Sequence, residues 1–88
     1  MSYTVLLTKP AIKSLDGMDR ATERRIRTRL RAFADNPYYP RLSKPLVGVG
    51  SIRSARVGDW RILFATDENE EAIVVLAVRP RGEAYRDL

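Results

Sequence analysis

Two arginines, Arg56 and Arg61, flank a four-residue segment whose centre is Gly58–Asp59. The central pair predicts a two-residue hairpin turn, because glycine readily adopts the positive φ that a type II′ turn needs at its first central position. Closing this turn places Arg56 directly opposite Arg61 on one face of the sheet. Since like charges that face each other destabilise a sheet, the arrangement favours a site for a polyanion. Two surface arginines that splay into water are the alternative.

Two more residues extend this cluster near the end of the sequence. Arg79 closes the last predicted strand, and Tyr85 follows six residues later. If that strand runs antiparallel to the second hairpin strand with an even register sum, Arg79 lies on the same face as Arg61, one or two pairs away. Tyr85 can then fold back over this face. Three guanidinium groups and a phenol would surround one hollow.

These side chains suit the cleavage of RNA by its own 2′-oxygen. The reaction needs one group that takes the 2′ proton, one that stabilises the charge of the phosphorane, and one that protonates the leaving 5′-oxygen. Arginine suits the second task, because it stays protonated and presents a planar fork of donors. Tyr85 is the candidate for proton transfer, because neighbouring cations favour the ionised phenol.

The composition limits the other kinds of chemistry. The chain has 88 residues, which predicts a single domain over residues 1–88, and it contains neither cysteine nor histidine. Disulfides, cysteine nucleophiles and the commonest metal ligand are therefore excluded, and we expect no metal ion and no cofactor. The net charge is +5 and arginine supplies 13 of the 16 cations, which favours nucleic acid or an acidic protein as partner. No apolar run approaches the length of a membrane span, so the expected location is the cytoplasm.

Capping residues and hydrophobic periodicity predict the elements that must position these side chains. Thr8 is expected to cap a short helix that stops at Gly17, and Asp19 a longer helix that ends at Asn36–Pro37. The segment 37–50 is interrupted by proline and glycine and is predicted to be a loop. The apolar stripe of the longer helix consists of Ile26, Leu30 and Phe33. Strands are expected at residues 3–8, 52–57, 60–65 and 72–78.

The longer helix carries six arginines and a single glutamate, Glu23. The arginines are Arg20, Arg24, Arg25, Arg27, Arg29 and Arg31. Two interpretations stay open: a solvated helical face, or an electrostatic strip that follows a phosphate backbone or docks an acidic partner. The tyrosines after this helix, Tyr38 and Tyr39, either stack on bases or pack against the helix end. The acidic segment 67–71 is expected to be a solvated turn rather than a metal site.

Taken in order, these elements and several motifs resemble the RelE/ParE toxin superfamily. The motifs are Asn36-Pro37, Lys44-Pro45-Leu46, the segment SARVGDWRILF at residues 54–64 and the segment RPRGEAYR at residues 79–86. The resemblance covers nearly the whole chain, and RVGDWRILF is its most specific part. It implies an α+β fold of the RelE-like microbial ribonuclease type, with two N-terminal helices packed on a small antiparallel β-sheet. It also implies a toxin of a type II toxin–antitoxin system, neutralised by a RelB-like antitoxin.

The same resemblance implies roles for individual residues. RelE-like members of the superfamily cleave mRNA in the ribosomal A site, and their catalytic positions are matched here by Arg61, Arg79 and Tyr85. A basic residue of their first hairpin strand is matched by Arg56. The implied RNA-binding set consists of Arg53, Arg56, Arg81 and Lys44.

The chain departs from the RelE pattern on the first hairpin strand. The pattern has two lysines where this sequence has Ile52 and Ser54, which leaves the general base unassigned. Arg53 is adjacent, but on a regular strand it points to the opposite face unless a bulge turns it. Arg81 is a further cation that could compensate.

The resemblance therefore implies one leading function and two alternatives. The leading function is that of a metal-independent endoribonuclease that cleaves mRNA on the ribosome and inhibits translation. Its partners would be the antitoxin, the ribosome and mRNA, with no membrane and no small-molecule cofactor. The alternatives are a ParE-like inhibitor of DNA gyrase and an inert member that only binds its antitoxin. Apolar residues that the antitoxin could contact, although core packing explains them equally well, are Ala11, Leu15, Ile26 and Leu30.

Overall fold

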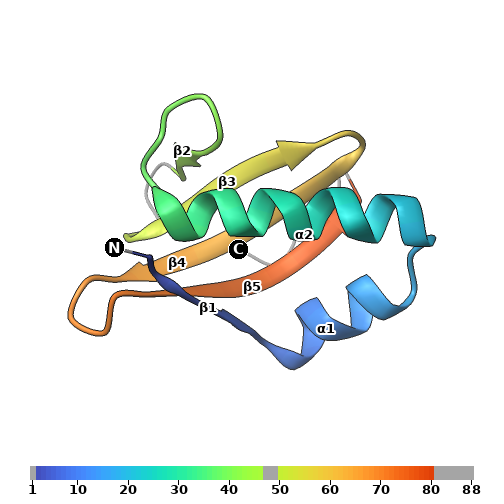
Figure 1. Ribbon diagram of the computed structural model, residues 1–88, viewed down its shortest axis with the longest axis horizontal. Helices are drawn as coiled ribbons and strands as arrows, with labels where there is room; N and C mark the ends of the chain where they lie inside the picture. The colour runs from blue at the N-terminus through green and yellow to red at the C-terminus, as the bar shows by residue number, and fades with distance from the viewer. Residues whose placement is uncertain (1, 47–49, 81–88) are drawn as a thin grey trace.

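The computed structural model describes residues 2–46 and 50–80 of the 88-residue chain. Its elements are β1 (Thr4–Leu7), α1 (Lys9–Asp16), α2 (Arg20–Asp35), β2 (Lys44–Pro45), β3 (Ile52–Val57), β4 (Trp60–Asp67) and β5 (Ala72–Pro80). Figure 1 shows the long helix α2 lying across one face of the sheet, with α1 near the end of β1. The expected α+β architecture, with two N-terminal helices packed on a sheet, is confirmed.

The five strands form one mixed sheet in the order β1-β5-β4-β3-β2. Strands β2 to β5 pair antiparallel with their neighbours, whereas β1 pairs parallel with β5. The expectation of an antiparallel sheet is therefore wrong for its first strand. Both helices follow β1 in the chain, so no hairpin joins β1 to the next strand. Its neighbour in the sheet is instead the last strand, β5, which runs parallel to it.

A two-residue strand, β2, interrupts the segment 37–50 that the sequence predicts to be a loop. Lys44 pairs with Ser54 and Pro45 pairs with Arg53 at the outer edge of the sheet. Proline is confined to such edges because it has no N–H to donate to a second neighbour. A pairing this short leaves no alternation of apolar and polar residues in the sequence, which is why the pattern does not reveal it.

The hairpin between β3 and β4 forms as its sequence predicts. Gly58 has a φ of 59°, Val57 pairs with Trp60, and Arg56 pairs with Arg61. A residue with a Cβ is strained at such a φ, whereas glycine is not. The glycine therefore fixes the turn, and the turn fixes the register of the two strands.

A register shift between β4 and β5 decides which side chains reach the core. Leu63 pairs with Ala77, but Phe64 pairs with Val75, so Leu76 is an extra residue on β5. Because side chains alternate along a strand, one extra residue changes the face of every residue beyond it. The bulge lets Phe64 and Val75 share the face that packs against the helices.

Both predicted helix caps are present. Thr8 Oγ1 accepts a hydrogen bond from the N–H of Ala11 at 3.4 Å, and Asp19 Oδ2 accepts one from the N–H of Thr22 at 3.0 Å. The Thr8 hydroxyl also lies within donating distance, 3.0 Å, of the carbonyl oxygen of Leu76 at the bulge. Thr8 therefore starts α1 and binds β5 at the point where its ladder is disrupted.

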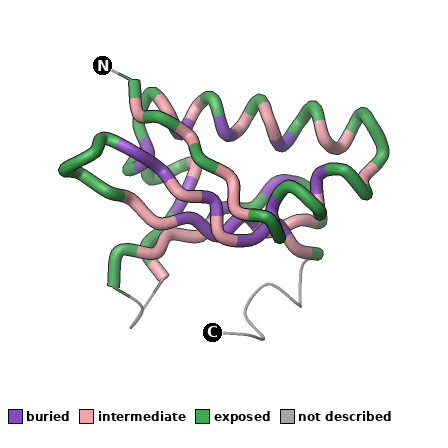
Figure 2. The backbone as a smooth tube through the Cα atoms, turned by 90° about the horizontal axis from the view of Figure 1, so that it is seen from below, coloured by how far each residue is buried: buried purple, intermediate pink, exposed green. Residues whose placement is uncertain are grey.

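The core lies between the sheet and the helices. Phe33 of α2 stacks on Phe64 of β4 with ring centroids 4.7 Å apart, and both side chains are fully buried. Figure 2 shows buried positions recurring along α2 on its sheet side. The predicted apolar stripe of this helix is therefore confirmed. Neither helix in the described segments is long and apolar enough to cross a membrane.

The apolar residues considered as antitoxin contacts belong to this core. Ala11, Leu15 and Ile26 have an exposed fraction of 0%, and Leu30 has 5%. Packing within the chain is the role of Ala11, Leu15 and Ile26, which a partner cannot reach, so their prediction as partner contacts is wrong. Leu30 also lines a hollow between β1 and α2, so its contact with a partner stays a prediction.

A hydrogen-bonded cluster on the surface ties the first strand to two distant segments. Tyr3, which precedes β1, donates its phenol proton to Glu68 in the turn between β4 and β5, 2.8 Å from Oε2. Tyr38, which follows α2, donates to the same carboxylate. Glu68 raises the pKa of Tyr3 to about 12, chiefly because it accepts the hydrogen bond of the neutral phenol. The acidic turn therefore binds both tyrosines, and Tyr38 is not held ready for bases.

This cluster predicts a loss of stability at high pH. An unfolded tyrosine ionises near pH ~10, whereas folded Tyr3 ionises at about 12. Between these values the unfolded state has released its proton and the folded state has not, so stability falls as the pH rises. The stability advantage of the wild type over Tyr3→Phe should therefore be full below pH ~10 and shrink toward pH ~12.

Urea unfolding of both proteins across this pH range measures the difference. The control is Tyr39→Phe, which changes an exposed tyrosine outside the cluster and should show no such trend. A constant gap between the wild type and Tyr3→Phe up to the highest pH would contradict the link to Glu68.

Candidate functional site

Three arginines form a row across the sheet, which we call the arginine row. Arg56 of β3 pairs with Arg61 of β4, and Arg61 pairs in turn with Arg79 of β5. Paired residues point to the same face of a sheet, so the three side chains lie together. Their neighbours along the strands, Val57 and Val78, belong to the core under the helices. The arginine row therefore lies on the face that the helices leave open.

The arginine row is tighter than the sequence predicts. Arg79 lies directly opposite Arg61 rather than one or two pairs away. Because opposite Cα atoms are about 5 Å apart, the three side chains start from a line about 10 Å long. Arg56 is exposed, whereas Arg61 and Arg79 are half-buried. Half-burial lowers the effective dielectric, which strengthens both the repulsion within the row and its attraction for an anion.

A hollow of about 270 Å³ opens beside the arginine row, next to the segment that leads into β2. Its cations are Arg41, Lys44, Arg56 and Arg61. The remaining lining residues are Pro40, Leu42, Ser43, Ser54 and Ala55. Among the residues that the structure describes, this lining contains cations but no acidic side chain.

Two of these cations come from the segment around β2. Lys44, which the resemblance implies to be RNA-binding, is brought to the hollow by its pairing with Ser54. Arg41 is a cation that the sequence reasoning missed. It lies in an irregular segment whose position depends on the short β2 pairing, so neither a motif nor a periodicity marks it. Its closeness to Lys44 in the sequence is the one signal that could have found it.

Arg53 does not join the arginine row. β3 pairs with β4 without a register shift from Ile52 to Val57, so Arg53 faces the helix side, as its place on a regular strand predicts. There its Nε donates to Ser43 Oγ at 2.9 Å and its Nη2 to the Ser43 carbonyl oxygen at 3.2 Å. Its guanidinium carbon lies 5.2 Å from the centroid of the Tyr38 ring. In the structure Arg53 therefore holds the segment before β2, and its contact with RNA stays a prediction.

Two predicted site residues, Arg81 and Tyr85, lie outside the residues that the structure describes. Within residues 2–46 and 50–80, no three acidic side chains gather closely enough to hold a metal ion. The cations of the arginine row can bind a phosphate group and stabilise negative charge that develops on it. Proton transfer requires a further group.

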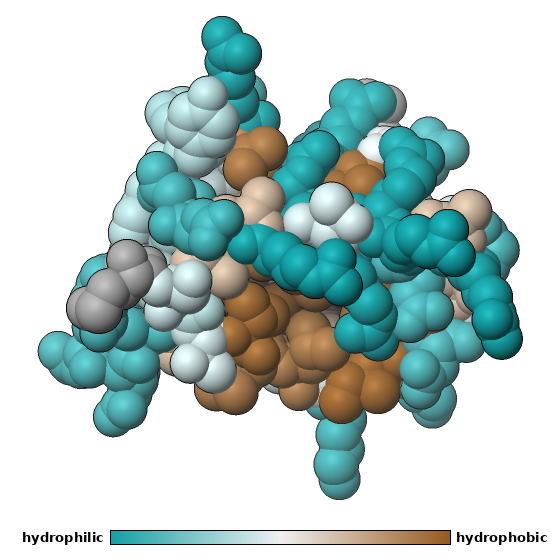
Figure 3. Space-filling model, in the orientation of Figure 1, coloured by the Kyte–Doolittle hydropathy of each residue, from teal (hydrophilic) through white to brown (hydrophobic). Residues whose placement is uncertain are grey.

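On the other side of the sheet, α2 carries arginines over the same hairpin. Arg29 Nη1 donates to the carbonyl oxygen of Arg56 at 3.2 Å, and Arg56 Nε donates to the carbonyl oxygen of Gly58 at 3.3 Å. Arg27 instead forms an ion pair with Glu23 at 2.9 Å. Figure 3 shows the long hydrophilic side chains that cover α2. The arginines of α2 are therefore not one uniform solvated strip, because some bind the hairpin and others do not.

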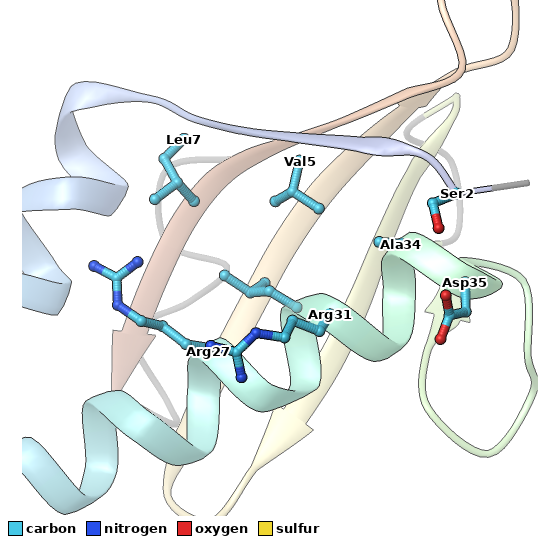
Figure 4. Close-up of a pocket in the computed structure, with 8 residues that line it drawn as sticks. Ser2, Val5, Leu7, Arg27, Arg31, Ala34 and Asp35 are labelled. Carbon is cyan, nitrogen blue, oxygen red and sulfur yellow. The ribbon is translucent and has the colours of Figure 1, made fainter.

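A larger hollow, of about 450 Å³, lies between β1 and α2 and is called here the β1–α2 groove (Figure 4). Val5, Leu7 and Leu30 give it an apolar lining, Arg27 and Arg31 add positive charge, and Asp35 adds one carboxylate. Figure 3 shows apolar surface on this side of α2. None of its lining residues belongs to the arginine row, so the groove is a candidate contact surface rather than a site of chemistry.

Comparisons with known proteins identify the family. Residues 5–85 match the family model described as the ParE toxin of type II toxin–antitoxin system, parDE. A comparison with curated protein sequences gives no match.

Solved structures show the same fold. A chain of the archaeal RelE–RelB complex from Pyrococcus horikoshii is 29% identical, with a TM-score of 0.81 over 96% of this chain and 100% of its own. A chain of the toxin–antitoxin complex RelBE2 from Mycobacterium tuberculosis is 26% identical, with a TM-score of 0.77 over 92% of this chain and 100% of its own. The isolated RelE toxin of E. coli is similar in fold alone, with 11% identity and a TM-score of 0.81 over 98% of this chain and 92% of its own. Because the family model spans most of the sequence, the chain belongs to the ParE toxin family, within the RelE/ParE superfamily of type II toxin–antitoxin systems.

Proposed function

We propose that this toxin is a metal-independent endoribonuclease that acts on the ribosome, cleaves mRNA in the A site and so inhibits translation. The observation that carries the proposal is the arginine row, which lies beside a hollow lined by two further cations. A phosphodiester fits such a set, because the guanidinium fork binds phosphate oxygens bidentately. The likeness to RelE–RelB chains supports the same branch of the superfamily.

The residues divide the reaction between them. The 2′-oxygen of one nucleotide loses its proton and attacks the adjacent phosphorus, and the 5′-oxygen of the next nucleotide leaves and gains a proton. The products are a 2′,3′-cyclic phosphate and a 5′-hydroxyl. Arg61 and Arg79 hold the scissile phosphate and stabilise the phosphorane, Arg56 orients the RNA backbone, and Tyr85 transfers a proton. Such a site is weak on free RNA and depends on the ribosome to position its substrate.

We also propose a RelB-like antitoxin as the protein partner. Two of the structural relatives are toxin–antitoxin complexes, RelE–RelB and RelBE2. The β1–α2 groove suits an amphipathic acidic segment, because Val5 and Leu7 offer apolar contacts while Arg31 offers positive charge. β1 is also an edge strand of the sheet, which gives an extended partner segment a ladder to join.

Removing a catalytic group should stop cleavage without unfolding the protein. Arg61→Ala removes a cation that stabilises the transition state, and we expect the rate of A-site cleavage to fall about 100-fold or more. Tyr85→Phe should lower it because the phenol proton is lost. Primer extension on a translated message measures the cleavage, and circular dichroism checks the fold. The control is Lys13→Ala, which removes an exposed charge of α1. An Arg61→Ala/Tyr85→Phe double variant that still cuts at the parental rate would end the proposal.

The charge of the arginine row should also lower the stability of the free protein. Arg56→Gln removes the charge that faces Arg61, so we expect the free energy of unfolding to rise by about 0.5 kcal/mol or less at low salt. The gain should shrink at high salt, because screening already weakens the repulsion. Urea unfolding at two salt concentrations measures it. Lys13→Gln, which removes a charge outside the row, is the control for net charge. A destabilised Arg56→Gln variant at low salt would contradict the repulsion.

Inhibition of DNA gyrase is the second candidate function. One observation favours it: the matching family model describes the ParE toxin. A gyrase inhibitor should block supercoiling by purified gyrase and induce the DNA-damage response in cells, while translated mRNA stays whole. Cleaved mRNA with normal supercoiling would exclude it. Normal supercoiling together with intact translation would indicate an inert, antitoxin-binding member.

A further inference from the structure

We propose that the protein has a second phosphate-binding site, the α2 notch, on the helix side of the β3–β4 hairpin. The notch is a hollow of about 370 Å³ between α2 and the hairpin turn. Its polar lining consists of Arg24, Arg25, Thr28 and Arg29. Its ligand is a phosphodiester of the RNA that also contacts the arginine row, so the inference rests on the proposed function for the identity of the polyanion.

Two arginines of the α2 notch are held against the hairpin. Arg29 Nη1 donates to the carbonyl oxygen of Arg56 at 3.2 Å. The guanidinium of Arg25 lies over Gly58, where a Cβ on the glycine would lie 3.5 Å from one of its nitrogens. Side chains that are already positioned lose less conformational entropy when a ligand binds. The notch is therefore organised before its ligand arrives.

The notch keeps its positive charge. None of its lining residues is acidic, and the carboxylate of Glu23 is engaged by Arg27 at 2.9 Å. Asp59 lines a smaller neighbouring hollow of about 110 Å³ together with Arg25. This carboxylate offsets at most one of the three arginines, so the notch retains net positive charge for an anion.

The notch and the arginine row meet at an open strand edge. β2 pairs with β3 only at Arg53 and Ser54, so among the described residues no strand lies beside the end of β3 on that side. Arg56 stands at this crossing, because its side chain belongs to the row and its carbonyl oxygen accepts from Arg29. A polyanion that lies along the row can therefore continue over the edge of β3 into the notch.

The lining favours a phosphate over an acidic peptide. The guanidinium fork matches phosphate oxygens bidentately, and the Thr28 hydroxyl adds a further donor. The apolar side chains that line the notch are Ala32 and Val57, and neither is large. An amphipathic peptide needs a broader apolar surface, which the β1–α2 groove offers and the notch does not.

The experiment compares two double variants that remove the same charge. The notch variant, Arg24→Gln/Arg25→Gln, removes two of the three cations of the notch. It leaves the hydrogen bond from Arg29 to the carbonyl oxygen of Arg56 in place. Lys9→Gln/Lys13→Gln removes two exposed cations of α1, away from the notch, and is the control. The probe is a short 2′-O-methyl RNA, which the protein cannot cleave because its 2′-oxygen is blocked. Its affinity for the full chain is measured from about 50 to 200 mM salt, and thermal melting checks that each variant folds.

We expect the notch variant to flatten the salt dependence. For each phosphate that the variant no longer binds, the slope of log affinity against log salt should fall in magnitude by about 0.7, and affinity at the low-salt end should fall about tenfold. The control should keep the wild-type slope. Equal flattening in both variants, or none in the notch variant, would overturn the proposal. Poly-glutamate is also tested as a competitor of RNA on the wild type and on the notch variant. If it competes on the wild type but not on the notch variant, and both proteins bind RNA equally, the notch would belong to an acidic protein instead.

Two further measurements distinguish the kind of RNA that the notch binds and separate the notch proposal from the nuclease proposal. A single-stranded probe and a stem–loop probe distinguish a message-like from a ribosomal RNA-like backbone as the preferred source of the phosphate. Because neither probe can be cut, their binding is independent of nuclease activity. An unchanged salt slope in the notch variant, with normal A-site cleavage by the wild type, would overturn the notch alone. A flattened slope in the notch variant, with no cleavage by the wild type, would overturn the nuclease alone.

Discussion

The one-residue register shift between β4 and β5 is the constraint on which both faces of the sheet depend. Val75 and Val78 are both buried in the core, yet they are three residues apart, and side chains on a regular strand share a face only at even separations. The extra residue Leu76 resolves this conflict. It keeps both valines under the helices and leaves Arg79 opposite Arg61. Without it, either the core or the arginine row would be lost, so packing and candidate chemistry depend on the same irregularity.

Local chemistry determines the parts of this fold that the sequence predicts well. Gly58 specifies the hairpin turn, Thr8 and Asp19 specify where the helices begin, and the spacing of apolar residues specifies the buried side of α2. The parallel pairing of β1 and the existence of β2 depend on contacts between distant segments, which no local pattern records. The spacing of Val75 and Val78 is the exception, because two core positions that are three residues apart in one strand indicate a bulge.

The candidate site also has residues whose positions the sequence predicts and residues whose positions it does not. The pairing of Arg56 with Arg61 follows from the turn between them and was predictable, whereas the partner of Arg79 depends on the bulge and on β5 as a whole. Arg41 was missed because a tertiary pairing, and not its own surroundings in the sequence, brings it to the hollow. Arg53 shows the converse. Its alternation along β3 correctly predicts its face, and the Ser43 contacts that occupy it explain why a cation there is structural.

Positive charge is concentrated on both faces of the sheet. The arginine row and the α2 notch lie on opposite faces of the sheet, so their cations come closest at the edge of β3, at Arg56. There the contact is between the guanidinium of Arg29 and the carbonyl oxygen of Arg56, which is a favourable pairing of a cation with a dipole. Each face nevertheless concentrates like charges without an acid among the residues that line it. A chain selected for stability alone would intersperse carboxylates, as Glu23 does for Arg27. The described residues of these two linings include no carboxylate, and a phosphate backbone of the proposed RNA partner would complement their charge.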